Sequence, residues 1–324
     1  ITYADTDGNI GFIAPALVPI RRGGDGSVPS PGWTADHDWT GYIPFDSLPQ
    51  AFNPAHGRIV NANHRIVGPD YPYFLGHAET PPYRARRIHD LLDATPKLAL
   101  EDAARMLMDP MSPIAHRLLP VLIAVAPRDP RQEAALALLR GWDGVMRRDR
   151  PEPLIFTAWV REIERALYAD EAGDLFNDLW NLRAEFIVRA LGAREIWCDD
   201  IRTPERETCG ERLQLALQRA LDTLAESHGR DVGSWKWGDA HAAKFPHAVF
   251  GFIPVIAGFT EIAVPVDGGA DTINRAQFDF ANDAAPFAAV HGPGYRAVYD
   301  LADLDRSLFT QATGQSGNPL SSRY

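Results

Sequence analysis

The chain has 324 residues, of which 45% are hydrophobic and 23% are charged, a composition typical of a globular protein with a sizeable core. Its formal net charge of −11 argues against nucleic acid or an anionic membrane as the main partner, because both require clustered Lys and Arg. No apolar run reaches the length of about eighteen residues that a transmembrane helix needs.

Residues 1–66 have the pattern of β-strands. In ITYADTDGNIGFIAP (1–15), two alternating segments flank the dipeptide Asp7-Gly8, which favours a tight hairpin turn. The strand pattern begins at the first residue, and this residue is Ile rather than Met. We therefore expect the chain to start partway through a longer protein.

The segment NPAHGRIVNANHRI (53–66) places amide side chains where a strand is expected to end. Asn is common in turns because its side chain can hydrogen-bond its own backbone. Asn61 and Asn63 are therefore explained as turn residues if nothing else in the chain points to a function. The following residues 69–82 are rich in Pro and Gly, which predicts a linker or lid.

From about residue 84 to residue 230, apolar side chains recur every three to four positions, which predicts six or seven successive helices. Their Leu, Met and Trp side chains are expected to form a core between packed helices. The predicted helices cover residues 84–94, 98–109, 114–126, 130–142, 154–170, 175–192 and 209–229.

After residue 245 the strand pattern returns, in short segments separated by Gly, Pro, Asn and Asp. Strands at both ends of the chain with helices between them predict an α+β fold, in which the terminal strands share one sheet system. The predicted strands lie within residues 261–269, 271–280, 286–292, 295–301 and 307–314.

Two cysteines, Cys198 and Cys209, flank a polar loop in WCDDIRTPERETCGERL. They are close enough in sequence to form a local disulfide, which would contribute about 3 kcal/mol in the chain-entropy treatment; two unrelated thiols are the alternative. A disulfide would indicate an oxidising compartment. Two cysteines alone do not make a structural zinc site, which needs four ligands.

Six segments carry the motifs of one known family, in the same order along the chain. They are YADTDGNIGFIAPALVPIR, PGW…DWTGYIPFDSLPQAFNPAHGRIVNANHRI, DYPYFLG…PPYRARRI, WKWGDAHAAKFPH, VHGPGYRAVYDL and GQSGNPLSSRY. The chain resembles, over essentially its whole length, the C-terminal portion of the β-chain of the penicillin acylase family of N-terminal-nucleophile (Ntn) hydrolases. The resemblance implies an αββα sandwich of antiparallel sheets with a large helical segment.

Pattern and resemblance together divide the chain into three regions. Residues 1–82 hold the N-terminal strands and a site loop of the αββα core. Residues 83–238 form the helical segment, and residues 239–324 hold C-terminal strands that return to the core.

In the family, a strand ending in Asn-x-Asn presents its second Asn to the scissile carbonyl, so the resemblance assigns Asn63 as the oxyanion donor. A neutral amide stabilises developing negative charge without titrating itself. Asn61 lies two residues earlier on the same strand face and is expected to contact or position the substrate. The family's downstream Arg falls on Arg84, with Arg86 and Arg87 as alternatives.

The resemblance implies acyl transfer by an N-terminal Ser that uses its own α-amino group as the base. Ile1 has no nucleophilic side chain, so we expect the nucleophile to precede it and this chain alone to be inactive. No catalytic cofactor is implied; a structural calcium ion is a further expectation, with Asp70 a candidate and no ligand set assigned. The expected partners are an N-acyl amide, the α-chain and the rest of the β-chain, in the periplasm or outside the cell.

Two classes of function remain open from the sequence. The first is an N-acyl amide hydrolase of penicillin acylase or acyl-homoserine-lactone acylase type, and the second is a non-catalytic fragment or homologue that acts as a binding or assembly module. A metallohydrolase built from His56, His64 and His77 is a third, but the sequence lacks a tight ligand pair. His241 and His247 are better explained by packing or backbone hydrogen bonds.

Overall fold

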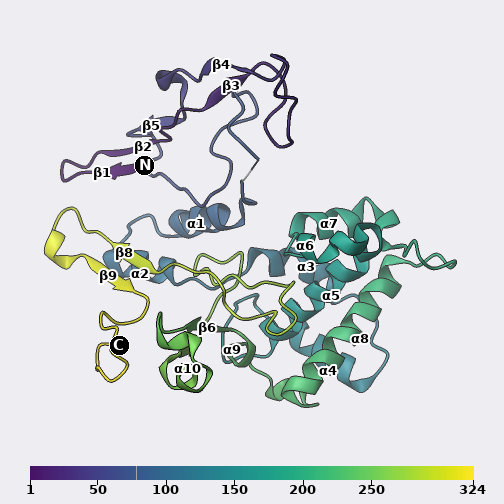
Figure 1. The fold of residues 1–324 in the computed structure, drawn as a ribbon. Helices are drawn as coiled ribbons and strands as arrows, with labels where there is room; N and C mark the ends of the chain where they lie inside the picture. Colours follow the sequence, from purple (N-terminus) through teal and green to yellow (C-terminus); the bar gives the residue numbers. More distant parts are fainter. Residues whose placement is uncertain (78) are drawn as a thin grey trace. The chain divides into compact units, whose positions relative to one another are not determined.

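The computed structural model describes residues 1–77 and 79–324, which form two compact units (Figure 1). The three regions assigned from the sequence do not coincide with these units, so that division stays a prediction. Unit 1 comprises Ile1–Leu100 and Val298–Leu308, and unit 2 comprises Glu101–Ala297 and Phe309–Tyr324.

Unit 1 consists of short antiparallel strands and one helix. A three-stranded sheet has the order β1-β2-β5, and a two-stranded sheet pairs β3 with β4. The bounds are β1 (Thr2–Ala4), β2 (Ile10–Ile13), β3 (Pro19–Arg21), β4 (Trp39–Tyr42), β5 (Gln50–Phe52) and helix α1 (Tyr83–Ala94).

The hairpin predicted around Asp7-Gly8 is confirmed. Gly8 has a φ of +88°, a left-handed conformation that glycine adopts without steric cost. Asp5 Oδ1 accepts the backbone N–H groups of Asp7 at 3.0 Å and of Asn9 at 2.9 Å, which holds the turn between β1 and β2. This hairpin follows from local turn chemistry, which explains why the sequence predicted it.

Helices dominate unit 2, and three of them start with side-chain caps. Ser112, Asp129 and Thr208 each accept backbone N–H groups from the first turn that follows. The helices are α2 (Leu100–Leu107), α3 (Pro113–Leu122), α4 (Pro130–Arg140), α5 (Glu152–Ala172), α6 (Phe176–Leu179), α7 (Ala184–Gly192), α8 (Cys209–His228), α9 (Trp237–Ala240) and α10 (Pro254–Thr260).

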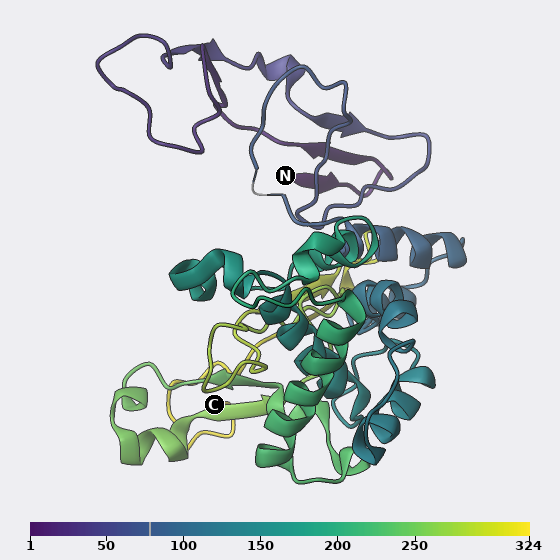
Figure 2. The same ribbon diagram turned by 90° about the vertical axis from the view of Figure 1, so that its right-hand side faces the viewer.

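The core of unit 2 is built around α5, which packs along α8 (Figures 1 and 2). Most of α5 is buried, including charged side chains. The Glu164 carboxylate lies inside this core and accepts the backbone N–H of Arg183. Burial raises the pKa of Glu164 to about 8, because the charged form is penalised where water is excluded.

The strands of unit 2 form small antiparallel pairs. β6 (Ala242–Phe245) pairs with β7 (Ile262–Pro265), and β8 (Tyr295–Val298) pairs with β9 (Leu308–Gln311), whose ends adjoin the boundary between the units. The predicted α+β content is confirmed. The expectation that the terminal strands share one sheet system stays a prediction.

Several predicted elements differ from the observed ones for tertiary reasons. The single helix expected over residues 175–192 is two helices, because Trp180 turns into the core, where its ring lies tilted against that of Phe176 with the centroids 4.8 Å apart. Residues 271–280 and 286–292 are not regular strands and meet through the single bridge Gln277↔His291. Strand β6 and helix α10 were not predicted.

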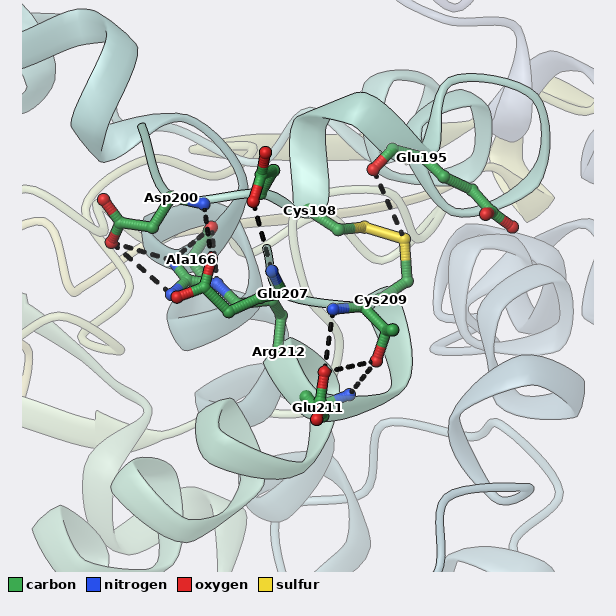
Figure 3. Close-up of a disulfide and its surroundings, with 10 residues drawn as sticks. Ala166, Glu195, Cys198, Asp200, Glu207, Cys209, Glu211 and Arg212 are labelled. Carbon is green, nitrogen blue, oxygen red and sulfur yellow. Dashed lines mark hydrogen bonds and ion pairs between the residues drawn. A yellow bond between two sulfur atoms is a disulfide. The ribbon is translucent and has the colours of Figure 1, made fainter. Parts of the chain in front are cut away.

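Cys198 and Cys209 form a disulfide, with their Cα atoms 4.9 Å apart (Figure 3). The bridge joins the end of the short 3₁₀ helix Glu195–Cys198 to Cys209, the first residue of α8. Close to it, Arg212 donates to the backbone oxygen of Ala166 at 2.7 Å and to Asp200 at 3.4 Å. The predicted local bridge is thus observed, and it tethers the start of α8.

Within residues 1–77 and 79–324, no helix has both the length and the apolar character required to cross a bilayer.

The disulfide predicts a measurable stability difference. Replacing both cysteines with Ala should lower the free energy of unfolding by about 3 kcal/mol, because the unfolded chain regains the entropy of the open loop. Urea unfolding of the variant, and of the unmodified protein with and without reductant, measures this difference. An unfolding midpoint that neither the substitutions nor the reductant changes would show that the bridge is not formed.

Glu164 predicts a pH-dependent stability. Its folded-state pKa of about 8 exceeds its ordinary value of 4.5, so the folded state holds a proton that the unfolded state releases. Stability should fall as pH rises from about 4.5 to 8, by at most about 1.4 kcal/mol per pH unit. Glu164→Gln keeps the shape and an acceptor oxygen but does not titrate, so its stability relative to the unmodified protein should increase from pH 5 to pH 8. Parallel pH profiles for both proteins would contradict this account.

Candidate functional site

Asn61 and Asn63 lie in a bend rather than at the end of a strand. Strand β5 ends at Phe52, and residues 53–66 contain no strand. Asn63 has a φ of +64°, which strands do not allow and which Asn tolerates better than most residues. The Asn61 Oδ1 atom accepts the Asn63 backbone N–H at 3.0 Å, a local turn that sets this conformation. The predicted strand, and with it the shared strand face, is wrong.

The bend is fastened to the segment that leads into α1. Thr80 donates its backbone N–H to the backbone oxygen of Asn63 at 2.8 Å, and its hydroxyl donates to the backbone oxygen of Ala62 at 3.1 Å. Ala62 is buried, whereas Asn61 and Asn63 are exposed on either side of it. The backbone of the bend is therefore fixed while the two amide side chains remain accessible.

Arg84, in the first turn of α1, reaches the same bend. Its Nη2 donates to the Ala62 oxygen at 2.8 Å and to Asn63 Oδ1 at 3.0 Å. A cation at a helix N-terminus is unfavourable with respect to the helix dipole, and the first turn of α1 has no acidic residue to compensate. Arg84 thus has specific contacts that a solvated charge at a helix start would lack. The structure brings Asn61, Asn63 and Arg84 together.

The contact with Arg84 fixes which way the Asn63 amide faces. A guanidinium can only donate hydrogen bonds, so the atom that it contacts must be the amide oxygen. The Nδ2 group of Asn63 then points away from Arg84, and within the described residues it has no hydrogen-bond acceptor. An exposed side chain therefore offers a donor in a defined orientation.

His64 adds to the electrostatics of the site. The sequence analysis considered His64 only as a metal ligand and did not identify Thr80. Burial lowers the pKa of His64, and the neighbouring His89 and Arg84 lower it further, which favours the neutral form of the ring. Its Nδ1 accepts the Ala62 N–H at 3.4 Å, which places the proton on Nε2. With Arg84 charged and His64 neutral, the local charge favours an anion near Asn63.

Four of the histidines considered as metal ligands make other contacts. His77 pairs with Asp25 at 2.6 Å, whereas His64 accepts from the backbone, and the described residues contain no group of three potential His, Cys, Asp or Glu ligands. The metal site considered for His56, His64 and His77 is therefore not formed. His241 and His247 hydrogen-bond backbone oxygens, as expected.

Comparison with known sequences gives matches along the whole chain. A family model described as Penicillin amidase matches residues 1–324. Penicillin acylase 2 proenzyme of Pseudomonas sp. (strain SE83) is 29% identical over 330 residues, which cover 100% of this chain and 42% of that protein. Acyl-homoserine lactone acylase QuiP of Pseudomonas fluorescens (strain Pf0-1) is 27% identical over 350 residues, which cover 100% of this chain and 41% of that protein.

Comparison with solved structures gives a matching fold. Thermostable penicillin G acylase from Alcaligenes faecalis aligns with a TM-score of 0.54 and 21% sequence identity, covering 82% of this chain and 54% of that chain. This likeness supports the predicted α+β fold of an Ntn hydrolase. The chain spans about two fifths of the length of the curated relatives it matches.

Proposed function

Because this chain belongs to the penicillin amidase family, we propose that it is part of an N-acyl amide hydrolase of penicillin acylase or acyl-homoserine-lactone acylase type. The observation that carries the proposal is the Asn63 amide, whose oxygen is held by Arg84 so that its NH₂ group faces outward. This is the donor that an acyl-transfer site requires. The catalytic nucleophile is proposed to come from polypeptide outside these 324 residues.

In the proposed reaction, an N-terminal Ser hydroxyl attacks the amide carbonyl and its α-amino group takes the proton. The carbonyl oxygen becomes negatively charged in the tetrahedral adduct, and Asn63 Nδ2–H donates to that oxygen. Collapse of the adduct releases the amine, and water then hydrolyses the acyl-enzyme ester to release the carboxylic acid. An oriented donor stabilises the charge without reorganising during the reaction, which is the main source of its effect.

Arg84 is proposed as a positioning residue in this site. Its guanidinium holds the Asn63 amide in one orientation and holds the bend through Ala62. The positive charge of Arg84 lies beside the amide oxygen of Asn63. It draws electron density toward that oxygen, which makes the N–H a stronger donor. Asn61 is proposed to support the same geometry through the Asn63 backbone.

The substrate class is proposed to be an N-acyl amide, in agreement with the printed names of the relatives. The proposed partners are the remaining parts of the α- and β-chains, and the proposed location is the periplasm or the cell exterior. The disulfide supports that location, because such bonds persist in oxidising compartments. No catalytic cofactor enters the proposed reaction, and a structural calcium ion stays a proposal.

Removing the Asn63 amide should slow the assembled enzyme. Asn63→Gly should lower kcat by about 10²–10³-fold with a much smaller change in KM, because the donor acts mainly in the transition state. Glycine is the informative replacement, since it accepts a φ of +64° without strain. Steady-state kinetics on an N-acyl amide substrate, with circular dichroism to confirm folding, measure the effect.

Asn63→Asp serves as the matched variant, because it keeps the oxygen that accepts from Arg84 but replaces the donor with a negative charge. It should be at least as slow as the glycine variant. Activity that survives either substitution would remove Asn63 from the reaction. No amide hydrolysis by the unmodified assembled protein would leave the binding or assembly module as the better account.

Arg84 should affect the rate through Asn63. Arg84→Met should lower kcat by about 10–100-fold, as expected for loss of a hydrogen bond from a charged donor. The double variant with Asn63→Gly should be no slower than Asn63→Gly alone by more than a few-fold, because the two residues act as one unit. Kinetics of the two single variants and the double variant test this coupling.

Arg86→Met is the control, since Arg86 is exposed in the same helical turn and was, with Arg87, one of the two sequence alternatives to Arg84. It should leave the rate unchanged. Equal losses for Arg84→Met and Arg86→Met, or fully multiplicative losses with Asn63→Gly, would show that Arg84 does not act by holding the amide.

A further inference from the structure

A cavity of about 610 Å³ lies within unit 2. Residues of β6, β7, β8 and β9 border it, together with the loops around residues 274–276 and 289–294 (β6, β8 and β9 in Figure 1). The volume falls in the range of small-molecule binding sites. All of its lining residues belong to unit 2, so the cavity is defined within one compact body.

Positive charge dominates the wall of this cavity. The guanidinium-bearing residues Arg148, Arg275 and Arg296 line it together with Lys244. Among the described residues that line it, Asp267 is the sole carboxylate, and one of its oxygens already accepts the Arg148 backbone N–H at 2.7 Å. Lys244 is also paired with Glu261 at 3.9 Å. The chain as a whole is acidic, so a cluster of three further cations beside a single lining carboxylate is a local exception.

The three arginines are held by neutral acceptors. Arg296 donates to Asn274 Oδ1 at 2.6 Å, and Arg275 donates to the Gln277 side-chain oxygen. Arg148 donates to the Pro265 backbone oxygen at 3.3 Å. Within the described part of the chain, none of the three lies within ion-pair distance of a carboxylate. These contacts orient the guanidinium groups but leave their charge unneutralised.

Arg275 also retains an unused donor. Its Nε atom is buried and has no hydrogen-bond partner among the described residues. Burial lowers the pKa values of both Arg275 and Arg296, which reflects the unfavourable environment of a charge removed from water. Arginine stays protonated even so. A cationic site that is partly buried, oriented and uncompensated is stabilised when an anion enters it.

We propose that this cavity binds a small oxoanion, a phosphate or carboxylate group of a free small molecule, through the guanidinium groups of Arg275 and Arg296. The planar fork of a guanidinium matches the spacing of two oxygens on either group. Arg148 raises the local positive potential at the rim, where its side chain is exposed, whereas the charge of Lys244 is partly offset by Glu261. Asn274 and Gln277 keep the two inner guanidinium groups in place.

Titration of the purified protein with inorganic phosphate, and separately with succinate, tests the proposal and distinguishes the two oxoanion types. Isothermal titration calorimetry should detect saturable binding of at least one of them, with chloride at equal ionic strength as the blank. At a free concentration tenfold above Kd, the apparent unfolding constant should fall by about tenfold. Binding of phosphate alone or of succinate alone identifies which group the cavity prefers.

Arg275→Gln and Arg296→Gln should each weaken the binding by at least about tenfold, as expected when one charged hydrogen-bond donor is lost. Arg230→Gln is the matched control, because it removes the same charge from an exposed position outside the cavity. It should leave the affinity unchanged. Equal weakening by all three substitutions would show a general charge effect and overturn the site.

A second measurement uses the unmodified protein, so it does not depend on the variants folding. Phenylglyoxal labels accessible arginines, and peptide mass spectrometry locates the label. The oxoanion should protect Arg275 and Arg296 at least several-fold more than Arg230, and chloride should not. No saturable binding of either oxoanion, or equal protection of all three arginines, would overturn the proposal.

Discussion

The contact between the Arg84 guanidinium and the Asn63 amide oxygen is the interaction on which the candidate site depends. One donor-only group fixes three properties together: the side-chain orientation of Asn63, the position of the Ala62 carbonyl and the sign of the local potential. Without it, the amide of an exposed Asn in a bend would rotate freely, and its two ends would be presented equally. The proposed function gives this small arrangement its chemical meaning, because acyl transfer needs an oriented neutral donor and Asn63 is proposed to be that donor.

The same device recurs elsewhere in the chain. Arg296 in unit 2 is held by the amide oxygen of Asn274, as Arg84 in unit 1 is held by that of Asn63. An amide or carbonyl oxygen orients a guanidinium without cancelling its charge, whereas a carboxylate would do both. Arg212 shows the opposite case. The carboxylate of Asp200 lies 3.4 Å from its guanidinium, so the charge of Arg212 is neutralised within the structure around α8. Arg84 and Arg296, which are held by neutral acceptors, therefore keep a positive charge that can interact with an incoming group.

The sequence predicted those elements whose cause is local. The Asp7-Gly8 hairpin, most helices of unit 2 and the disulfide follow from turn chemistry, apolar periodicity and short spacing. The strand expected before Asn63 failed because a side chain, Asn61, competes for the backbone and imposes a positive φ, which a pattern of apolar residues does not reveal. The break near Trp180 depends on packing across the core. The family motifs named Arg84 and Asn63 as separate site residues. Their contact was not predicted, since no rule of spacing links residues twenty-one positions apart.

The short span of the Cys198–Cys209 bridge has a consequence for biosynthesis. Only eleven positions separate the two sulfurs, so both leave a ribosome or a translocation channel almost together and can be oxidised before the rest of the polypeptide has emerged. A bond of this kind does not guide distant segments toward one another. It instead restrains the beginning of one long helix locally, since Cys209 is the first residue of α8.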